Sequence, residues 1–159
     1  MTATAAKATT APAAETTFVP GYAPGVPFLK ADAHGQPYIE GHRCGACGAA
    51  YTLPRLACPR CFSRDALVPF RSSGRGHVHT YTVVHRSYPG IKVPFVSAIV
   101  DLDDGLVLKG NLTGVPIDPT QIPFGLPIRV VFDEVPGQKD AQGLPYLTYF
   151  FAPEKDAAA

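Results

Sequence analysis

Residues 43–62 read RCGACGAAYTLPRLACPRCF and contain every cysteine of the 159-residue chain. The cysteines form two Cys-x2-Cys pairs, Cys44 with Cys47 and Cys58 with Cys61, with ten residues between the pairs. Two such pairs supply four thiolates from two short turns, which is the ligand set of a tetrahedral structural zinc ion. Because four cysteines leave no coordination position for water, such a metal would stabilise the fold and perform no chemistry. An iron centre of the rubredoxin type and a redox or disulfide role are the alternatives.

The expected cellular environment favours metal binding by the cysteines over disulfide formation. The first residues, MTATAAKATTAPAAETT, lack the continuous apolar region of a secretory signal, and no run of about 18 apolar residues predicts a transmembrane helix. We therefore expect a cytoplasmic protein without a membrane contact, and paired cysteines in a reducing cytoplasm are more often metal ligands than disulfides. Residues 1–25 are expected to form a disordered or extended tail, because Ala, Thr and Pro offer little apolar surface to bury.

The rest of the chain predicts a mainly β fold. Its 17 prolines and 15 glycines favour short strands joined by turns. Asp103-Asp104-Gly105 suits a tight hairpin turn, segment 115–127 is a Pro-rich connection, and 137–143 is a polar loop. Five strands are expected to close into a small barrel, which leaves no exposed sheet edges. The strands predicted from β-branched and aromatic residues are 76–88, 94–102, 106–114, 128–135 and 144–153.

The segment before the cysteines is expected to form a separate arm. Residues 26–40 are predicted to begin with a short helix at 27–35 and to continue into a strand that reaches the first cysteine pair. The predicted organisation is therefore the arm at 26–40, the cysteine-containing module at 41–68 and the barrel at 69–153.

Charge is unevenly distributed along the chain. Eight basic residues and one acid, Asp65, lie between positions 43 and 92, whereas four basic residues and nine acids lie from Val93 onward. This balance predicts an anionic partner near the cysteine module, either nucleic acid or the phosphates of a nucleotide-containing cofactor, unless these side chains are simply solvated. The eight basic residues are Arg43, Arg55, Arg60, Arg64, Arg71, Arg75, Arg86 and Lys92.

Several motifs together resemble the DUF35 family. They are the run from RCGACG through LPRLACPRCFSRDALVPFRSSGRGHVHTYTVVHR, then PFVSAIVDLDDGLVLKGNL and GLPIRVVFDE. The resemblance covers about residues 26–152. It implies a rubredoxin-like zinc ribbon followed by a five-stranded OB-fold barrel, preceded by a short N-terminal helical arm.

The resemblance also implies a function. Members of this family typically accompany thiolase-like enzymes, or CoA-thioester hydratases and aldolases. It implies a non-catalytic subunit that binds a thiolase-like protein, helps to shape its acyl-CoA site and carries structural zinc. Arg55, Arg71 and Arg75 are the candidate contacts to CoA phosphates. The alternative is a single-stranded nucleic-acid-binding module that stacks bases on Tyr81, Tyr88 and Phe95.

Catalysis by the chain alone is not expected. A thiolase needs an activated thiolate, and the metal would occupy all four thiols. His77, His79 and His85 share one face of a predicted strand, but His85 would lie about 26 Å from His77, too far for a three-histidine metal site. We interpret the histidines as partly buried barrel or interface residues, Asp103 and Asp104 as turn residues, and the segment 72–76 as a flexible joint between ribbon and barrel.

Overall fold

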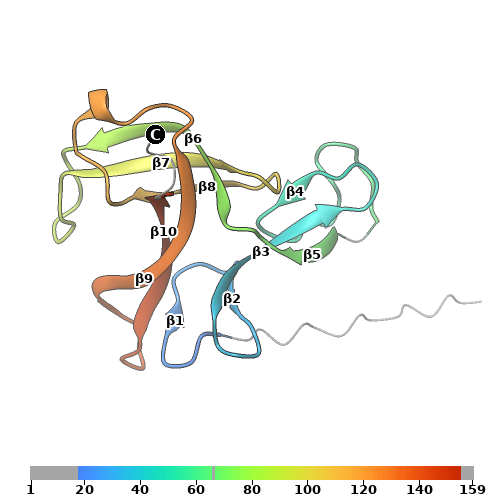
Figure 1. Cartoon of the computed structure of the whole chain (residues 1–159). Coiled ribbons are helices and arrows are strands. Elements are labelled where there is room, and N and C mark those ends of the chain that lie inside the picture. The colour runs from blue at the N-terminus through green and yellow to red at the C-terminus, as the bar shows by residue number, and fades with distance from the viewer. Residues whose placement is uncertain (1–17, 66, 155–159) are drawn as a thin grey trace, which may run out of the picture.

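The structure is a computed structural model that describes residues 18–65 and 67–154. Within these residues nearly all regular structure is β, and the helical content is one 3-10 turn, η1 (Pro119–Gln121). Figure 1 shows a barrel with the smaller ribbon module beside it. The strands are β1 (Ala23–Pro24), β2 (Leu29–Ala31), β3 (Pro37–Cys44), β4 (Ala50–Tyr51), β5 (Leu67–Arg71), β6 (Arg75–Val84), β7 (Phe95–Leu102), β8 (Val107–Leu112), β9 (Pro127–Lys139) and β10 (Pro145–Pro153).

The barrel contains the five strands that the sequence predicts. β6 pairs antiparallel with β7 and β9, β7 pairs with β8, and β9 pairs with β10. The last contact is parallel and joins β8 to β10 through the pair Leu112 and Phe151. β8 and β10 have only this one paired position, and the residues of both strands that precede it, 109–111 and 148–150, line the pocket described below.

Alternation of apolar residues builds the barrel core. On β7, Val96, Ala98, Val100 and Leu102 are buried while the residues between them are more exposed. Phe151 of β10 is completely buried in the same cluster. Complete burial of a side chain of this size contributes roughly 1.5–3 kcal/mol, so the core depends on the register of each strand.

Two strands have limits that differ from the prediction. β6 ends at Val84 instead of continuing to 88, and the connection that follows contains a turn in which the N–H of Ile91 donates to the carbonyl of Tyr88. β9 runs through much of the predicted polar loop to Lys139, which pairs with Pro145. Gly137 has a φ of 72° inside this stretch, where a bulge interrupts the pairing with β10 between Glu134 and Lys139.

The predicted helix in the arm is wrong. Residues 29–31 instead form β2, which pairs antiparallel with β3. Leu29 and Ala31 are buried and Lys30 is not, a period of two that suits a strand. Asp32 makes the turn, since its carboxylate accepts hydrogen bonds from the N–H groups of His34 and Gln36. Upstream, β1 adds parallel to the edge of β10.

The predicted flexible joint between ribbon and barrel is held by hydrogen bonds. The Asp104 carboxylate accepts from the Ser72 hydroxyl at 2.6 Å and from the N–H of Ser73 at 2.9 Å. Arg43, on the ribbon side, donates to the Asp104 carbonyl at 2.7 Å and lies over the Phe70 ring. The tip of the β7–β8 hairpin thus binds both the ribbon and the connection, as the approach of this hairpin to β4 in Figure 1 shows.

Among the described residues, no helix is long and apolar enough to cross a membrane.

Candidate metal centre and barrel pocket

Both cysteine pairs lie in turns with the same backbone hydrogen bond. In the first turn the N–H of Gly48 donates to the carbonyl of Cys44 at 2.9 Å, and in the second the N–H of Phe62 donates to the carbonyl of Cys58 at 2.8 Å. The residue that closes each turn has a left-handed backbone, with φ of 73° at Gly48 and 60° at Phe62. The repeated local structure turns the sulfurs of both pairs toward a common point.

The four sulfurs have the separations that a tetrahedral metal requires. The Sγ atoms of Cys44, Cys47, Cys58 and Cys61 all lie within 4.8 Å of one another. The Sγ atoms of Cys44 and Cys61 are 3.8 Å apart, and those of Cys47 and Cys58 are 3.6 Å apart. Sulfurs about 2.3 Å from zinc at tetrahedral corners lie about 3.8 Å apart, so the arrangement fits a structural zinc ion.

Tyr51 supports this cluster, and sequence reasoning missed it. Its hydroxyl lies 3.3 Å from the Cys58 sulfur. Donation of this hydrogen bond, helped by backbone N–H groups, lowers the pKa of the Cys58 thiol to about 6 and so favours the thiolate that a metal binds. The guanidinium of Arg55 lies 5.2 Å from the centre of the Tyr51 ring. An aromatic residue between the cysteine pairs was the one available signal.

The three arginines predicted to contact CoA phosphates have three different settings. Arg55 lies against Tyr51 in the ribbon. Arg71 forms an ion pair with Asp32 at 3.0 Å and covers the Tyr38 ring. Arg75 forms an ion pair with Glu154 at 3.0 Å. Arg71 and Arg75 would have to exchange carboxylate partners for phosphates, so their role stays a prediction.

The histidines of β6 lie on the outer surface of the barrel, where each faces an aspartate. Nδ1 of His79 lies 2.7 Å from the Asp101 carboxylate, and Nδ1 of His77 lies 3.6 Å from that of Asp103. Both imidazoles are more than half exposed, so the expectation of partial burial in the barrel is wrong for these two residues. A bulge between Val78 and Thr80 places His79 outside the regular pairing.

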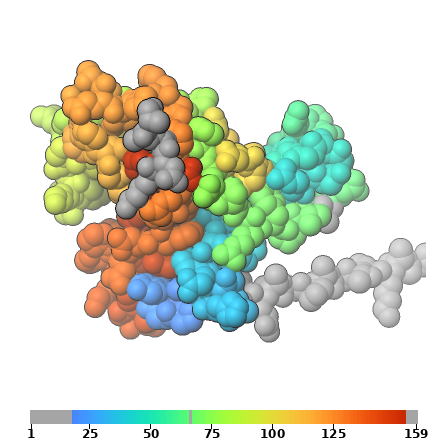
Figure 2. Space-filling model, viewed as in Figure 1, coloured from blue at the N-terminus to red at the C-terminus, as the bar shows by residue number. Residues whose placement is uncertain are grey.

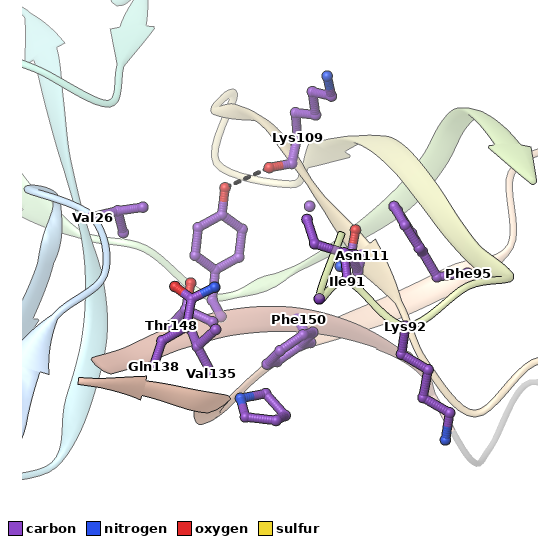
Figure 3. Close-up of a pocket in the computed structure, with 14 residues that line it drawn as sticks. Val26, Ile91, Lys92, Phe95, Lys109, Asn111, Val135, Gln138, Thr148 and Phe150 are labelled. Atoms are coloured by element: carbon purple, nitrogen blue, oxygen red, sulfur yellow. Dashed lines mark hydrogen bonds between the residues drawn. The ribbon is translucent and has the colours of Figure 1, made fainter. Parts of the chain in front are cut away.

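A pocket of about 450 Å³ opens between β8 and β10, beside their one paired position. Its wall includes the β6–β7 loop, the bent end of β9 and Val26 from the arm. Figure 3 shows Thr148 and Phe150 of β10 on one side of the pocket and Asn111 of β8 on another. In the same view the Tyr149 hydroxyl donates to the carbonyl of Lys109, a bond of 2.7 Å that joins the two strands.

The pocket combines an apolar lining with two cations. Ile91, Phe95 and Phe150 supply apolar surface, and Lys92 and Lys109 are also among the lining residues, with side chains that extend away from each other in Figure 3. An OB-fold commonly binds ligands on this face, beside the loop that joins its first two strands. Such a site suits an elongated ligand that has an apolar part and a negative charge. Sequence reasoning missed it because the lining comes from five separate segments.

Comparison with known proteins gives the family. Residues 32–67 match the family model described as the ChsH2 rubredoxin-like zinc ribbon domain, and residues 71–133 match the ChsH2 C-terminal OB-fold domain. A DUF35 domain-containing scaffold protein of Methanocaldococcus jannaschii is 31% identical over 117 residues, which are 72% of this chain and 81% of that protein. The chain therefore belongs to the DUF35 family, as its motifs predict.

Two further similarities involve enzyme complexes. The benzoylsuccinyl-CoA thiolase subunit BbsA of Thauera aromatica is 33% identical over 92 residues, 56% of this chain and 62% of that subunit. The solved structure titled Ltp2-ChsH2(DUF35) aldolase contains a chain with 30% identity and a TM-score of 0.57, matched over 73% of this chain and 84% of that one.

Proposed function

We propose that this protein is a non-catalytic zinc-ribbon and OB-fold subunit of a thiolase-type complex that acts on acyl-CoA thioesters. The observation that carries the proposal is the similarity, over 92 residues, to a subunit of benzoylsuccinyl-CoA thiolase. In this role the chain binds a thiolase-like protein, stabilises it and contributes part of the wall of its acyl-CoA site. A CoA-thioester aldolase is the related partner class, supported by the similarity to the aldolase complex.

The cysteine chemistry supports a non-catalytic role. A thiolase needs a nucleophilic thiolate that a nearby base activates. The sequence has four cysteines, and all four lie in the cluster whose geometry suits zinc. All four are free thiols in the structure, in the form from which metal-binding thiolates arise. The reacting thiolate is therefore assigned to the partner.

Contact with acyl-CoA is the finer part of the proposal. Arg55, Arg71 and Arg75 remain the predicted contacts for the phosphates. The pocket between β8 and β10 is a second observation that supports an acyl-CoA ligand, because apolar residues and two lysines, Lys92 and Lys109, line it. It is large enough for part of such a ligand, since sites for small molecules commonly occupy about 300–1,000 Å³.

Co-expression with the thiolase-type subunit of the same genome tests the proposal. We expect the two proteins to co-purify, one zinc ion to be present per copy of this chain, and thioester turnover by the partner to fall at least tenfold when this chain is omitted. A partner that is fully active alone, or turnover of the thioester by this chain alone, would contradict the proposal.

Two double variants distinguish ligand binding in the pocket from phosphate binding by the arginines. Lys92→Glu with Lys109→Glu should raise the KM for acyl-CoA without preventing co-purification if the pocket receives the ligand. Arg71→Gln with Arg75→Gln tests the phosphate contacts in the same assay. Lys30→Glu is the matched control for a change of charge, because Lys30 does not line the pocket.

A further inference from the structure

We propose that the outer end of the zinc ribbon is the surface that docks on the partner subunit. This inference rests on the proposed function. The surface, here named the ribbon tip, contains three exposed apolar side chains around the second cysteine turn. Leu56 is 98% exposed, Phe62 80% and Leu53 43%. The remaining members of the ribbon tip are the exposed Arg55, Arg60 and Arg64.

The position of Phe62 is unfavourable for the isolated fold. Its φ is 60°, in the left-handed region where a residue with a side chain loses roughly 1–2 kcal/mol relative to the ordinary conformation. Gly48 occupies the corresponding place in the first turn without this cost. The aromatic ring gains no burial in return, since it extends into solvent. A strained, exposed aromatic residue is explained if a binding partner covers it.

Within residues 18–65 and 67–154, the fold leaves the side chains of the ribbon tip exposed. The contact between the ribbon and the barrel lies elsewhere, where Arg43 of β3 donates to the carbonyl of Asp104 in the β7–β8 turn. Figure 2 shows the ribbon projecting to one side of the barrel. The exposed side chains therefore lie where a second protein has access.

Charge indicates what kind of surface covers the ribbon tip. Three arginines surround the apolar residues, and the nearby Asp65 already accepts a hydrogen bond from the Ser63 hydroxyl at 2.7 Å. Arginine and aromatic side chains supply much of the binding energy at protein interfaces. The complementary surface is an apolar depression edged by carboxylates.

A second copy of this chain does not offer such a surface in its pocket. The pocket between β8 and β10 has apolar lining residues, but Lys92 and Lys109 also line it. Docking of the ribbon tip there would place lysines beside arginines, and like charges at an interface are unfavourable. We therefore assign the ribbon tip to the thiolase-type subunit.

Variants of the full chain test this assignment through the affinity for the thiolase-type subunit. Phe62→Gly removes the aromatic ring and relieves the backbone strain, so we expect this variant to remain folded while it loses the side chain. Leu56→Asp and Leu56→Lys remove the same apolar side chain but add opposite charges. Phe124→Gly is the control, because Phe124 is an aromatic residue 72% exposed on the connection after β8. Zinc content and melting temperature are measured for each variant.

We expect Phe62→Gly and Leu56→Asp each to weaken binding about tenfold or more, Leu56→Lys to weaken it less, and Phe124→Gly to leave it unchanged. If Leu56→Asp and Leu56→Lys weaken binding equally, the inference that carboxylates edge the partner's surface is wrong. Wild-type affinity in both ribbon-tip variants would overturn the docking surface and leave the proposed function intact. Failure of the wild-type chain to bind would instead contradict the proposed function. Dimerisation of the isolated chain that Leu56→Asp abolishes would assign the ribbon tip to a second copy and overturn the inference.

Discussion

At the scale of single residues, Gly48 and Phe62 have the same backbone role with different side chains. Each closes a cysteine turn with a positive φ. Glycine adopts this conformation without steric cost, whereas phenylalanine does not. Substitutions at the two positions therefore measure how much the left-handed conformation of a residue with a side chain lowers the free energy of unfolding.

Phe62→Gly should raise the free energy of unfolding of the zinc-bound protein by about 0.5 kcal/mol, because relief of strain exceeds the added entropy of the unfolded chain. Gly48→Ala should lower it by about 1 kcal/mol, although space around Gly48 is open. Urea unfolding measures both. A stability loss above about 1 kcal/mol in Phe62→Gly would show that the ring stabilises the isolated fold and remove the strain argument.

Tyr149 gives a prediction about pH. Burial raises the pKa of its hydroxyl to about 12, above the ordinary value of about 10. The folded protein thus keeps this proton at a pH where the unfolded chain loses it. The stability contributed by the neutral hydroxyl is complete below about pH 10 and is lost as the pH rises toward 12.

Tyr149→Phe should lower the free energy of unfolding by about 1 kcal/mol at pH 7, since the Lys109 carbonyl loses its donor. Between pH 9 and pH 11 the difference between wild type and variant should shrink, because Tyr149 ionises in the unfolded wild type. Urea unfolding at several pH values tests this, and the other tyrosines cancel in the comparison. A difference that stays constant over this range would contradict the assigned pKa.

At the scale of elements, the β7–β8 hairpin has a second role besides its place in the barrel. Asp103 and Asp104 fit the predicted turn, but the Asp104 carboxylate also binds Ser72 and Ser73 of the ribbon–barrel connection. The N–H of Leu106 donates to the same carboxylate at 3.2 Å. One side chain thus joins the hairpin to the connection.

Asp104→Ala should lower the free energy of unfolding by about 2 kcal/mol, because at least two donors lose a charged acceptor. It should also increase proteolysis between Arg71 and Arg75. Asp103→Ala is the matched control, since its exposed carboxylate faces His77 at the barrel surface. If both alanine variants resist protease as well as the wild type does, the carboxylate does not hold the connection.

At the scale of the whole molecule, ribbon and barrel depend on different forces. The barrel contains a continuous apolar core from β6 to β10, whereas the ribbon has few buried side chains besides its cysteines. Small modules of this kind obtain much of their folding free energy from the metal. The two modules should therefore respond differently to loss of zinc.

Removal of the metal with a strong chelator should unfold residues 41–68 while the barrel strands stay folded. Hydrogen exchange should show loss of amide protection in β4 and β5 and retention in β7 and β8. Added zinc should restore the ribbon, which provides the control for irreversible damage. Unfolding of the barrel together with the ribbon would show that the two modules form one cooperative unit.

Local chemistry made much of this protein predictable. Cysteine spacing indicates the metal cluster because four ligands in two short turns need little help from the rest of the chain. Runs of β-branched and aromatic residues indicate the five barrel strands, because strand propensity is also a local property of the chain. The helix expected at 27–35 was wrong because burial of Leu29 and Ala31 depends on pairing with β3, which local composition does not report.

Long-range pairing decided the remainder. The pocket forms beside the pair Leu112 and Phe151, residues far apart in the sequence. The fixed joint exists because Asp104 reaches Ser72 across 32 positions. Contacts of this kind follow from how the barrel closes, and closure depends on all five strands at once, so no single segment carries the information.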